Sequence, residues 1–329
     1  MGELRAKRVA MAAVLVAAVG AGAAVHRFWL RELMHLTGEA QWIWVSDALE
    51  RVHPTAGLFV AAMRLENPPS EALLKVCGDR EYVVYVNGSP AACGWSRPGF
   101  HLDVFDIGHL LRQGDNALAV EVRSPTPVGG LLLALDVTGV RRNILVSGPA
   151  FRSRSTFSLV APGDGDGPIP VTWGRPPRFP WAYPDPVSRP RTLDEVVVED
   201  PIHLDSRLAV EIPGGGWLTR PTTPVFGYLW LELPEGDAAY VDVRESPSAF
   251  DPAVARSEAQ PVVRLRGQTR WLDPEPRWIG EIAVFGTKVA PTVDLWPVPE
   301  ELRRAAPGVV RGTHGPVPRA RWSTRIPPG

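Results

Sequence analysis

The chain opens with a helical apolar pattern and then alternates apolar and polar residues in short runs. Val9 to Val25 carries no charge and follows Arg5, Lys7 and Arg8. At 1.5 Å per residue this run spans roughly 25 Å, the low end for a bilayer core. It therefore predicts a transmembrane anchor within residues 1–37. Basic residues before such a run favour a cytoplasmic N-terminus, with the bulk of the chain periplasmic at a bacterial inner membrane.

Small residues in this run raise two further questions, whether it is cleaved and whether it contacts another helix. Ala21-Gly22-Ala23 also fits the small-residue cleavage site of a signal peptide, so removal competes with retention. Ala13, Ala17 and Ala21 recur every four residues, as do Ala18 and Gly22, which would let a second transmembrane helix approach closely. An Ala-rich composition explains the same spacing equally well.

Residues 38–161 read as successive short β-strands separated by turns. In "EYVVYVNGSPAACG", Asn87-Gly88 predicts a tight hairpin, because both residue types tolerate positive φ. Eight strand-like segments at this spacing predict an antiparallel sandwich or jelly roll. "DIGHLLRQGDN", from Asp106 to Asn116, predicts a single helical turn between strands.

The rest of the chain divides into three segments that differ in composition. Residues 162–201 are rich in Pro and Gly and predict an extended aromatic linker. Strand patterns return over residues 202–300 and predict a second sandwich. Residues 301–329 have an excess of Arg and Pro and predict a tail without regular structure unless a partner holds it. The expected fold is mainly β: two antiparallel jelly-roll sandwiches after one helix.

Three segments in the first sandwich carry a family resemblance: "AQWIW" from Ala40, "GDREYVVYVNG" from Gly78 and "DVFDIGHLLRQGDNALAVEV" from Asp103. They resemble the galactose-binding-like sandwich near the N-terminus of bacterial α-L-rhamnosidases. "FGYLWLEL" and "RWLDPEPRWIGEIAVFG" resemble, more weakly, the second sandwich of those enzymes. The resemblance implies a non-catalytic fold in which Trp271, Arg277 and Trp278 are packing and sheet-edge residues rather than catalytic ones. The helical catalytic domain that follows in that family has no counterpart here.

Composition and the absence of known motifs limit the functions that the sequence supports. A formal charge of -1 gives no basic footprint for nucleic acid. The sequence contains no serine-hydrolase, zinc-protease or phosphate-loop motif and no cysteine pattern for zinc, redox or haem chemistry, so we expect neither an enzyme nor a cofactor. Cys77 and Cys93 are candidates for a disulfide worth about 3 kcal/mol, with two buried thiols as the alternative.

Twelve tryptophans require an explanation. Aromatic rings serve as sugar platforms or partner contacts, but they also fill cores and interfaces. The candidates are Trp42, Trp44, Tyr82, Tyr85 and Trp95 in the first sandwich and Trp173, Trp181 and Tyr183 in the linker.

Three functions remain open. The expected function is a membrane-anchored scaffold or accessory subunit of a bacterial membrane complex, similar in architecture to sandwich-bearing subunits of energy-transducing or photosynthetic assemblies. Its partners would be the bilayer and subunits of the complex. The alternatives are a surface-anchored carbohydrate-binding protein, with a glycan as partner, and a degenerate glycosidase.

Overall fold

The computed structural model describes most of the chain. The described residues are 2–46, 55–94, 101–125, 128–137, 141–155, 167–178, 181, 184–186, 192–196, 200–234, 239–246, 250–262 and 268–300. The expected C-terminal tail lies outside them.

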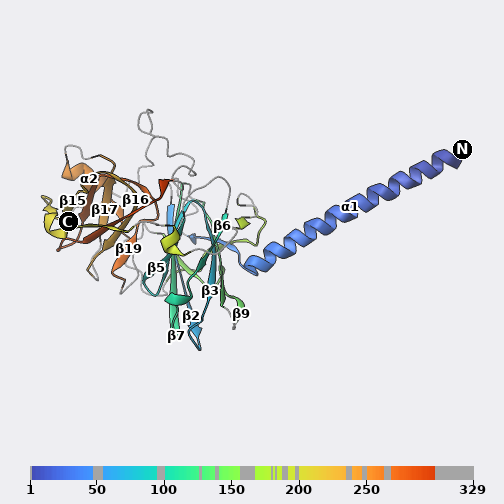
Figure 1. The fold of residues 1–329 in the computed structure, drawn as a ribbon, viewed down its shortest axis with the longest axis horizontal. Coiled ribbons are helices and arrows are strands. Elements are labelled where there is room, and N and C mark those ends of the chain that lie inside the picture. The colour runs from blue at the N-terminus through green and yellow to red at the C-terminus, as the bar shows by residue number, and fades with distance from the viewer. Residues whose placement is uncertain are drawn as a thin grey trace.

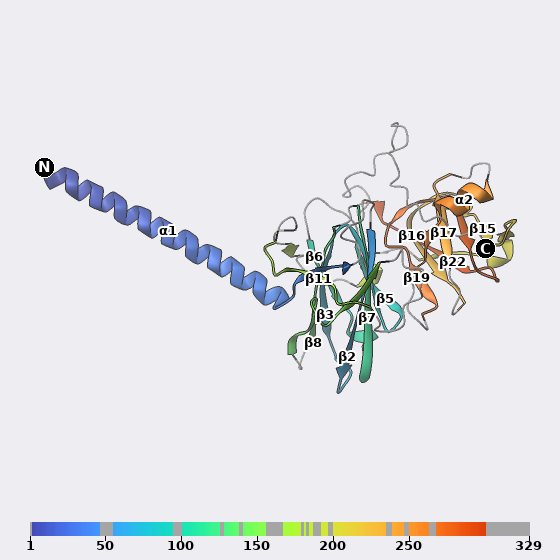
Figure 2. The same cartoon turned by 180° about the vertical axis from the view of Figure 1, so that it is seen from behind.

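The fold is mainly β, as the sequence predicts, with one long helix and several short ones. The helices are α1 (Gly2–Thr37), α2 (Pro252–Glu258), η2 (Gly108–Leu110), η3 (Leu193–Glu195) and η4 (Ser206–Leu208). Two pairs of sheets follow α1 along the chain, and α1 itself extends away from them in both views (Figures 1 and 2). Within the described part of the chain, no helix combines the length and apolar character that membrane crossing requires.

The first pair of sheets forms a sandwich from strands β1 to β12. These are β1 (Trp42–Trp44), β2 (Thr55–Leu65), β3 (Ala72–Gly78), β4 (Glu81–Val86), β5 (Ser89–Gly94), β6 (His101–Asp106), β7 (Gly114–Ser124), β8 (Leu131–Val137), β9 (Arg141–Val146), β10 (Arg152–Ser155), β11 (Val171–Gly174) and β12 (Asp185–Pro186).

Strands β1 to β8 alternate between the two sheets of this sandwich except at the hairpin, where β4 and β5 lie side by side in one sheet. One sheet has the order β11-β1-β8-β3-β6-β12, with β9 beside β8, and the other has the order β10-β2-β7-β4-β5. The central orders β1-β8-β3-β6 and β2-β7-β4-β5 are shared by jelly rolls. All pairings are antiparallel among the described strands of this sandwich except that of β12 with β6.

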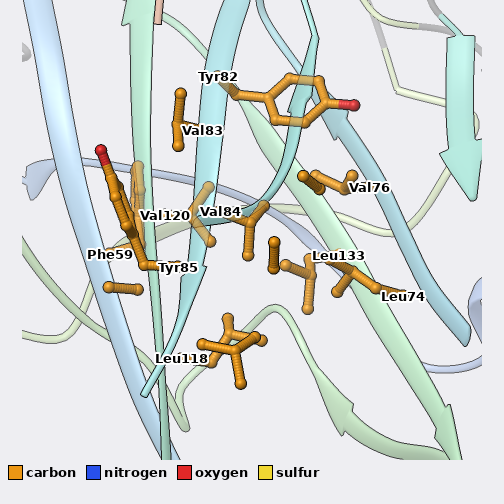
Figure 3. Packing of buried hydrophobic residues seen from close by; sticks show 14 of the residues in the cluster. Phe59, Leu74, Val76, Tyr82, Val83, Val84, Tyr85, Leu118, Val120 and Leu133 are labelled. Carbon is orange, nitrogen blue, oxygen red and sulfur yellow. The ribbon is translucent and has the colours of Figure 1, made fainter. Parts of the chain in front are cut away.

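The core of the first sandwich lies between these sheets. Leu74, Val76 and Leu133 come from one sheet and meet Val84 and Val120 from the other (Figure 3). All five are fully buried, and their alternation along each strand is the period that a half-buried strand predicts. Burying them supplies the main driving force for closing the two sheets.

The predicted hairpin is confirmed. β4 and β5 pair on either side of Asn87 and Gly88, whose φ angles are 51° and 83°. The Asn87 side chain donates to Leu110 O and to Asn116 Oδ1 and accepts from the Ala117 N–H. The amide thus ties the turn to η2, where the sequence predicts a single helical turn, and to β7.

The second pair of sheets contains strands β13 to β22. These are β13 (Ile202–Leu204), β14 (Val210–Glu211), β15 (Trp217–Thr219), β16 (Val225–Glu232), β17 (Tyr240–Arg244), β18 (Gln260–Pro261), β19 (Arg270–Leu272), β20 (Arg277–Ile279), β21 (Glu281–Phe285) and β22 (Thr292–Pro297). One sheet has the order β13-β22-β16-β19, with β20 beside β16, and the other has the order β14-β15-β21-β17-β18. Leu229, Leu231, Val241, Val284 and Leu295 pack between them.

The aromatic segment at residues 162–201, expected to be an extended linker, is in part a component of the first sandwich. Its strands β11 and β12 extend the β1 sheet of the first sandwich, pairing with β1 and β6. Trp181 is 2% exposed, because it packs on the outer face of that sheet. A Pro-rich composition predicted extension correctly, but it could not show that the extended backbone pairs with a sheet edge.

Candidate functional site

The aromatic candidates of the sequence are structural where the structure describes them. Trp42, Trp44, Tyr82, Tyr85 and Trp181 are each at most 3% exposed, and Trp173 is partly buried. Rings at such depth offer no open face for a sugar to stack on. Trp95 and Tyr183 lie outside the described residues.

Three of the tryptophans form one cluster on the outer face of the β1 sheet. The Trp42 and Trp181 rings stack with centroids 5.0 Å apart, and Trp173 lies 6.3 Å from Trp181. Glycine makes the approach possible, because a Cβ at Gly130 would lie 2.7 Å from the Trp181 ring. The cluster therefore attaches the segment around Trp181 to the first sandwich.

The candidate disulfide is not formed, and Cys77 and Cys93 are both buried thiols. Cys77 lies on β3 in the cluster with Trp42, on the outer face of one sheet. Cys93 lies on β5 of the opposite sheet and pairs with Val83, which shares its face with Tyr85. The two thiols therefore lie on opposite sides of the sandwich, whose sheets are separated by about 10 Å.

A dense polar arrangement lies where the second sandwich packs against the β4 and β7 strands of the first. The Tyr85 hydroxyl donates to Leu272 O at 3.1 Å and accepts from the Leu272 N–H at 2.9 Å. The Trp271 indole N–H donates to Glu121 Oε2 at 3.0 Å. Both partners of each bond are buried, so these contacts join the sandwiches in a region without water access.

Charged side chains continue this contact. Arg123 Nη1 lies 3.0 Å from Asp273 Oδ1 and 3.8 Å from Glu275 Oε2, while its Nη2 lies 3.6 Å from Glu121 Oε1. Arg277 also contacts Asp273. We call Glu81, Glu121, Arg123, Asp273, Glu275 and Arg277 the interface cluster.

Burial and charge set the protonation of this cluster. Burial raises the pKa of Glu121 to about 7, against the opposing attraction of Arg123. Burial and the Glu275 carboxylate raise the pKa of Glu81 to about 7 as well. The pKa of Asp273 shifts in the opposite direction. Burial alone would raise it, but the attraction of Arg277 and Arg123 holds the pKa of this carboxyl below its usual value. The cluster therefore contains two carboxyls that titrate near neutrality and one that stays ionised.

Raised carboxyl pKa values also mark acid catalysts, so the geometry must decide between the two roles. The side chains of Glu121 and Asp273 are 2% and 0% exposed. Protein atoms from both sandwiches therefore cover these two carboxyls. Within the described ranges, no group of three His, Cys, Asp or Glu side chains is placed to hold a metal ion. The arrangement joins the sandwiches rather than exposing a reactive group.

Sequence reasoning named only Arg277 of this cluster, as a packing or sheet-edge residue. Glu121 and Arg123 alternate with Val120 and Val122, a pattern that normally marks a solvated strand face. The expected packing role of the Trp271 segment does fit, since the Trp271 ring is fully buried. Tyr85 was a further signal, because this aromatic residue lies on the same face of β4 as Glu81.

No protein-family model matches the sequence, and no curated protein matches it. Solved structures do show similarity. The α-L-rhamnosidase from Dictyoglumus thermophilum is 14% identical with a TM-score of 0.41, covering 79% of this chain and 35% of its own. The enzyme from Aspergillus terreus is 16% identical with a TM-score of 0.42, covering 79% and 36%. The lectin from Pleurotus ostreatus in complex with GalNAc is 14% identical with a TM-score of 0.37, covering 79% and 77%.

The resemblance to α-L-rhamnosidases that the sequence motifs indicate is therefore found in the structural comparison too. This chain spans about a third of the length of those enzymes. At these identities and TM-scores the similarity concerns the fold and carries no conclusion about a reaction or a ligand.

Proposed function

We propose that this protein is a non-catalytic, membrane-anchored scaffold or accessory subunit. In this proposal α1 anchors the chain in a bacterial inner membrane with its N-terminus in the cytoplasm. The two joined sandwiches then form an extracytoplasmic body that contacts other subunits of a membrane protein complex.

The apolar surface of α1 carries the proposal. Each large apolar side chain described along residues 11–26 is between 58% and 72% exposed: Met11, Val14, Leu15, Val16, Val19 and Val25. A contiguous apolar surface of this kind marks a contact with lipid or with another protein. The uncharged run from Val9 to Val25, preceded by basic residues, favours lipid as the cover.

The attachment of α1 to the first sandwich supports a scaffold in particular. Lys75 is 7% exposed, and its ammonium donates to the Leu36 carbonyl and to Asp136 Oδ2, the latter at 2.6 Å. Thr37, the last residue of the helix, is 2% exposed, and Ala40, three residues beyond it, is fully buried. A buried cation on the last turn fixes the helix end, so the anchor transmits its orientation to the sandwich.

The distance from membrane to sandwich follows from the same geometry. From His26 to Thr37 the helix continues beyond the apolar run for about 18 Å, at 1.5 Å per residue. The first sandwich would therefore stand clear of the lipid headgroups, where it can contact the outer face of neighbouring membrane proteins.

Carbonate extraction of bacterial membranes tests the anchor. The full-length chain should stay in the membrane pellet, and Leu15→Arg/Val16→Arg should release it, because each Arg costs about 2.5–3.5 kcal/mol at the centre of a span. The matched control Leu15→Val/Val16→Leu keeps the composition and should stay in the pellet. Extraction of the unmodified chain by carbonate would overturn the anchor.

A further inference from the structure

The interface cluster holds more negative than positive charge. Glu81, Glu121, Asp273 and Glu275 supply four carboxyls, whereas Arg123 and Arg277 supply two guanidinium groups inside the interface and Arg80 a third at its exposed edge. Asp273 contacts both guanidinium groups. Arg123 is thereby shared among several carboxylates, so the described residues lack enough buried positive charge to keep every carboxyl ionised.

The two sandwiches create this imbalance together. Glu81 and Glu121 lie on β4 and β7, and in an isolated first sandwich their face would meet water. Trp271, Asp273 and Glu275 of the second sandwich cover that face and bring two further carboxylates. Removing water from a carboxylate and adding a like charge both favour its protonated form. Contact between the sandwiches is therefore coupled to proton uptake.

We propose that the interface is a proton-sensitive joint, in which Glu81 and Glu121 take up protons when the sandwiches close against each other and release them when the sandwiches part. This joint is independent of the anchor proposed above and of any partner. It would let the acidity of the surrounding compartment decide how rigidly the two sandwiches are held.

The ionisable groups that face the two carboxyls come from both sandwiches. They are Arg80, Tyr85, Cys93 and Arg123 from the first sandwich and Tyr228, Asp273, Glu275 and Arg277 from the second. Burial raises the pKa of Tyr85 and of Tyr228 well above their usual value, so both stay neutral. Arg80 is exposed at the edge, where water screens its charge.

The direction of the pH effect follows from the raised values. The pKa of both carboxyls is about 7 in the closed joint, against 4.5 in water. Between these values the closed joint holds protons that the open joint releases, so closure is strongest at the acidic end and weakens as pH rises through about 7. Asp273, whose pKa is lowered, opposes this only below its ordinary value, at strongly acidic pH.

Hydrogen exchange on the full-length chain in mild detergent tests the joint. The probe is the Leu272 N–H, which donates to the Tyr85 hydroxyl across the interface. After correction for intrinsic exchange, its opening constant should rise about tenfold per pH unit for each proton released, from about pH 5 to about pH 7. The Ala283 N–H, inside the second sandwich on β21, reports global opening and should change less.

Two variants and a control complete the test. Glu81→Gln/Glu121→Gln removes both titrating groups but keeps an acceptor for the Trp271 N–H, and it should make the opening constant of Leu272 independent of pH. Glu211→Gln, an exposed carboxyl on β14, should leave the pH dependence of the unmodified chain in place. A Leu272 opening constant that does not change with pH in the unmodified chain would refute the joint. So would an unchanged pH slope in the double variant.

Discussion

Arg123 and Asp273 lie in different sandwiches, yet their side chains meet at 3.0 Å in a buried ion pair. The Arg123 side chain is 8% exposed and the Asp273 side chain is 0% exposed. A buried ion pair costs desolvation on both sides, so it persists only where further contacts hold the two groups in place. Tyr85 and Trp271 supply those contacts by hydrogen bonds across the same surface. The sandwiches are therefore joined by directional contacts as well as by apolar packing.

The first prediction concerns this ion pair. Arg123→Met should lower the free energy of unfolding by about 3–5 kcal/mol, because it leaves Glu121 buried without a guanidinium partner and Asp273 with Arg277 alone. Denaturant titration of the full-length chain in detergent measures the loss. The matched control is Arg64→Met, which removes an ion pair to Asp115 with both side chains 80% exposed and should cost less than about 1 kcal/mol. Equal losses in the two variants would contradict a structural role for the buried pair.

The second prediction concerns Tyr85. Tyr85→Phe removes both hydrogen bonds to Leu272 and should cost about 1–3 kcal/mol, since the N–H and C=O of Leu272 stay buried without a partner. The loss should appear as faster exchange of the Leu272 N–H. Tyr82→Phe is the comparison variant, because it removes a hydrogen bond to Asp103 within the first sandwich. If both variants speed Leu272 exchange equally, Tyr85 has no special part in the interface.

The third prediction concerns the end of α1. Lys75→Met should remove the cation that joins the Leu36 carbonyl to Asp136 and let the helix pivot on the first sandwich. Spin labels at His26 and Glu66, both exposed, should then report a broader distance distribution. Lys288→Met alters an exposed lysine in the second sandwich and should leave the distribution narrow. A narrow distribution in Lys75→Met would mean that apolar packing alone fixes the helix.

Local patterns predicted much of the fold. The Asn87-Gly88 turn, the strands around it and the helical turn at η2 follow from signals within a few residues of one another. The extra strand β11 does not, because its pairing with β1 joins residues far apart in the sequence. The Pro-rich composition predicted an extended backbone for that segment, but it did not predict that the backbone pairs with β1.

The interface cluster shows the same limit more sharply. A strand that alternates apolar and charged residues has the same sequence whether water or a second domain covers its charged face. Glu121 and Arg123 therefore looked solvated, and only the position of Trp271 and Asp273 shows that they are buried. The aromatic candidates were open to two interpretations for a related reason. A ring suited to sugar contact is equally suited to a core, and Trp42, Trp44 and Trp181 occupy buried sites.

The size of the native particle tests the scaffold most directly. The full-length chain would be solubilised in mild detergent from membranes of the cells that make it and analysed by native mass spectrometry. We predict a particle whose mass corresponds to this chain bound to integral membrane subunits in fixed stoichiometry. The Leu15→Arg/Val16→Arg variant should be detected without those subunits. If the unmodified chain is detected only as a single copy, with no bound subunit, the scaffold proposal is contradicted.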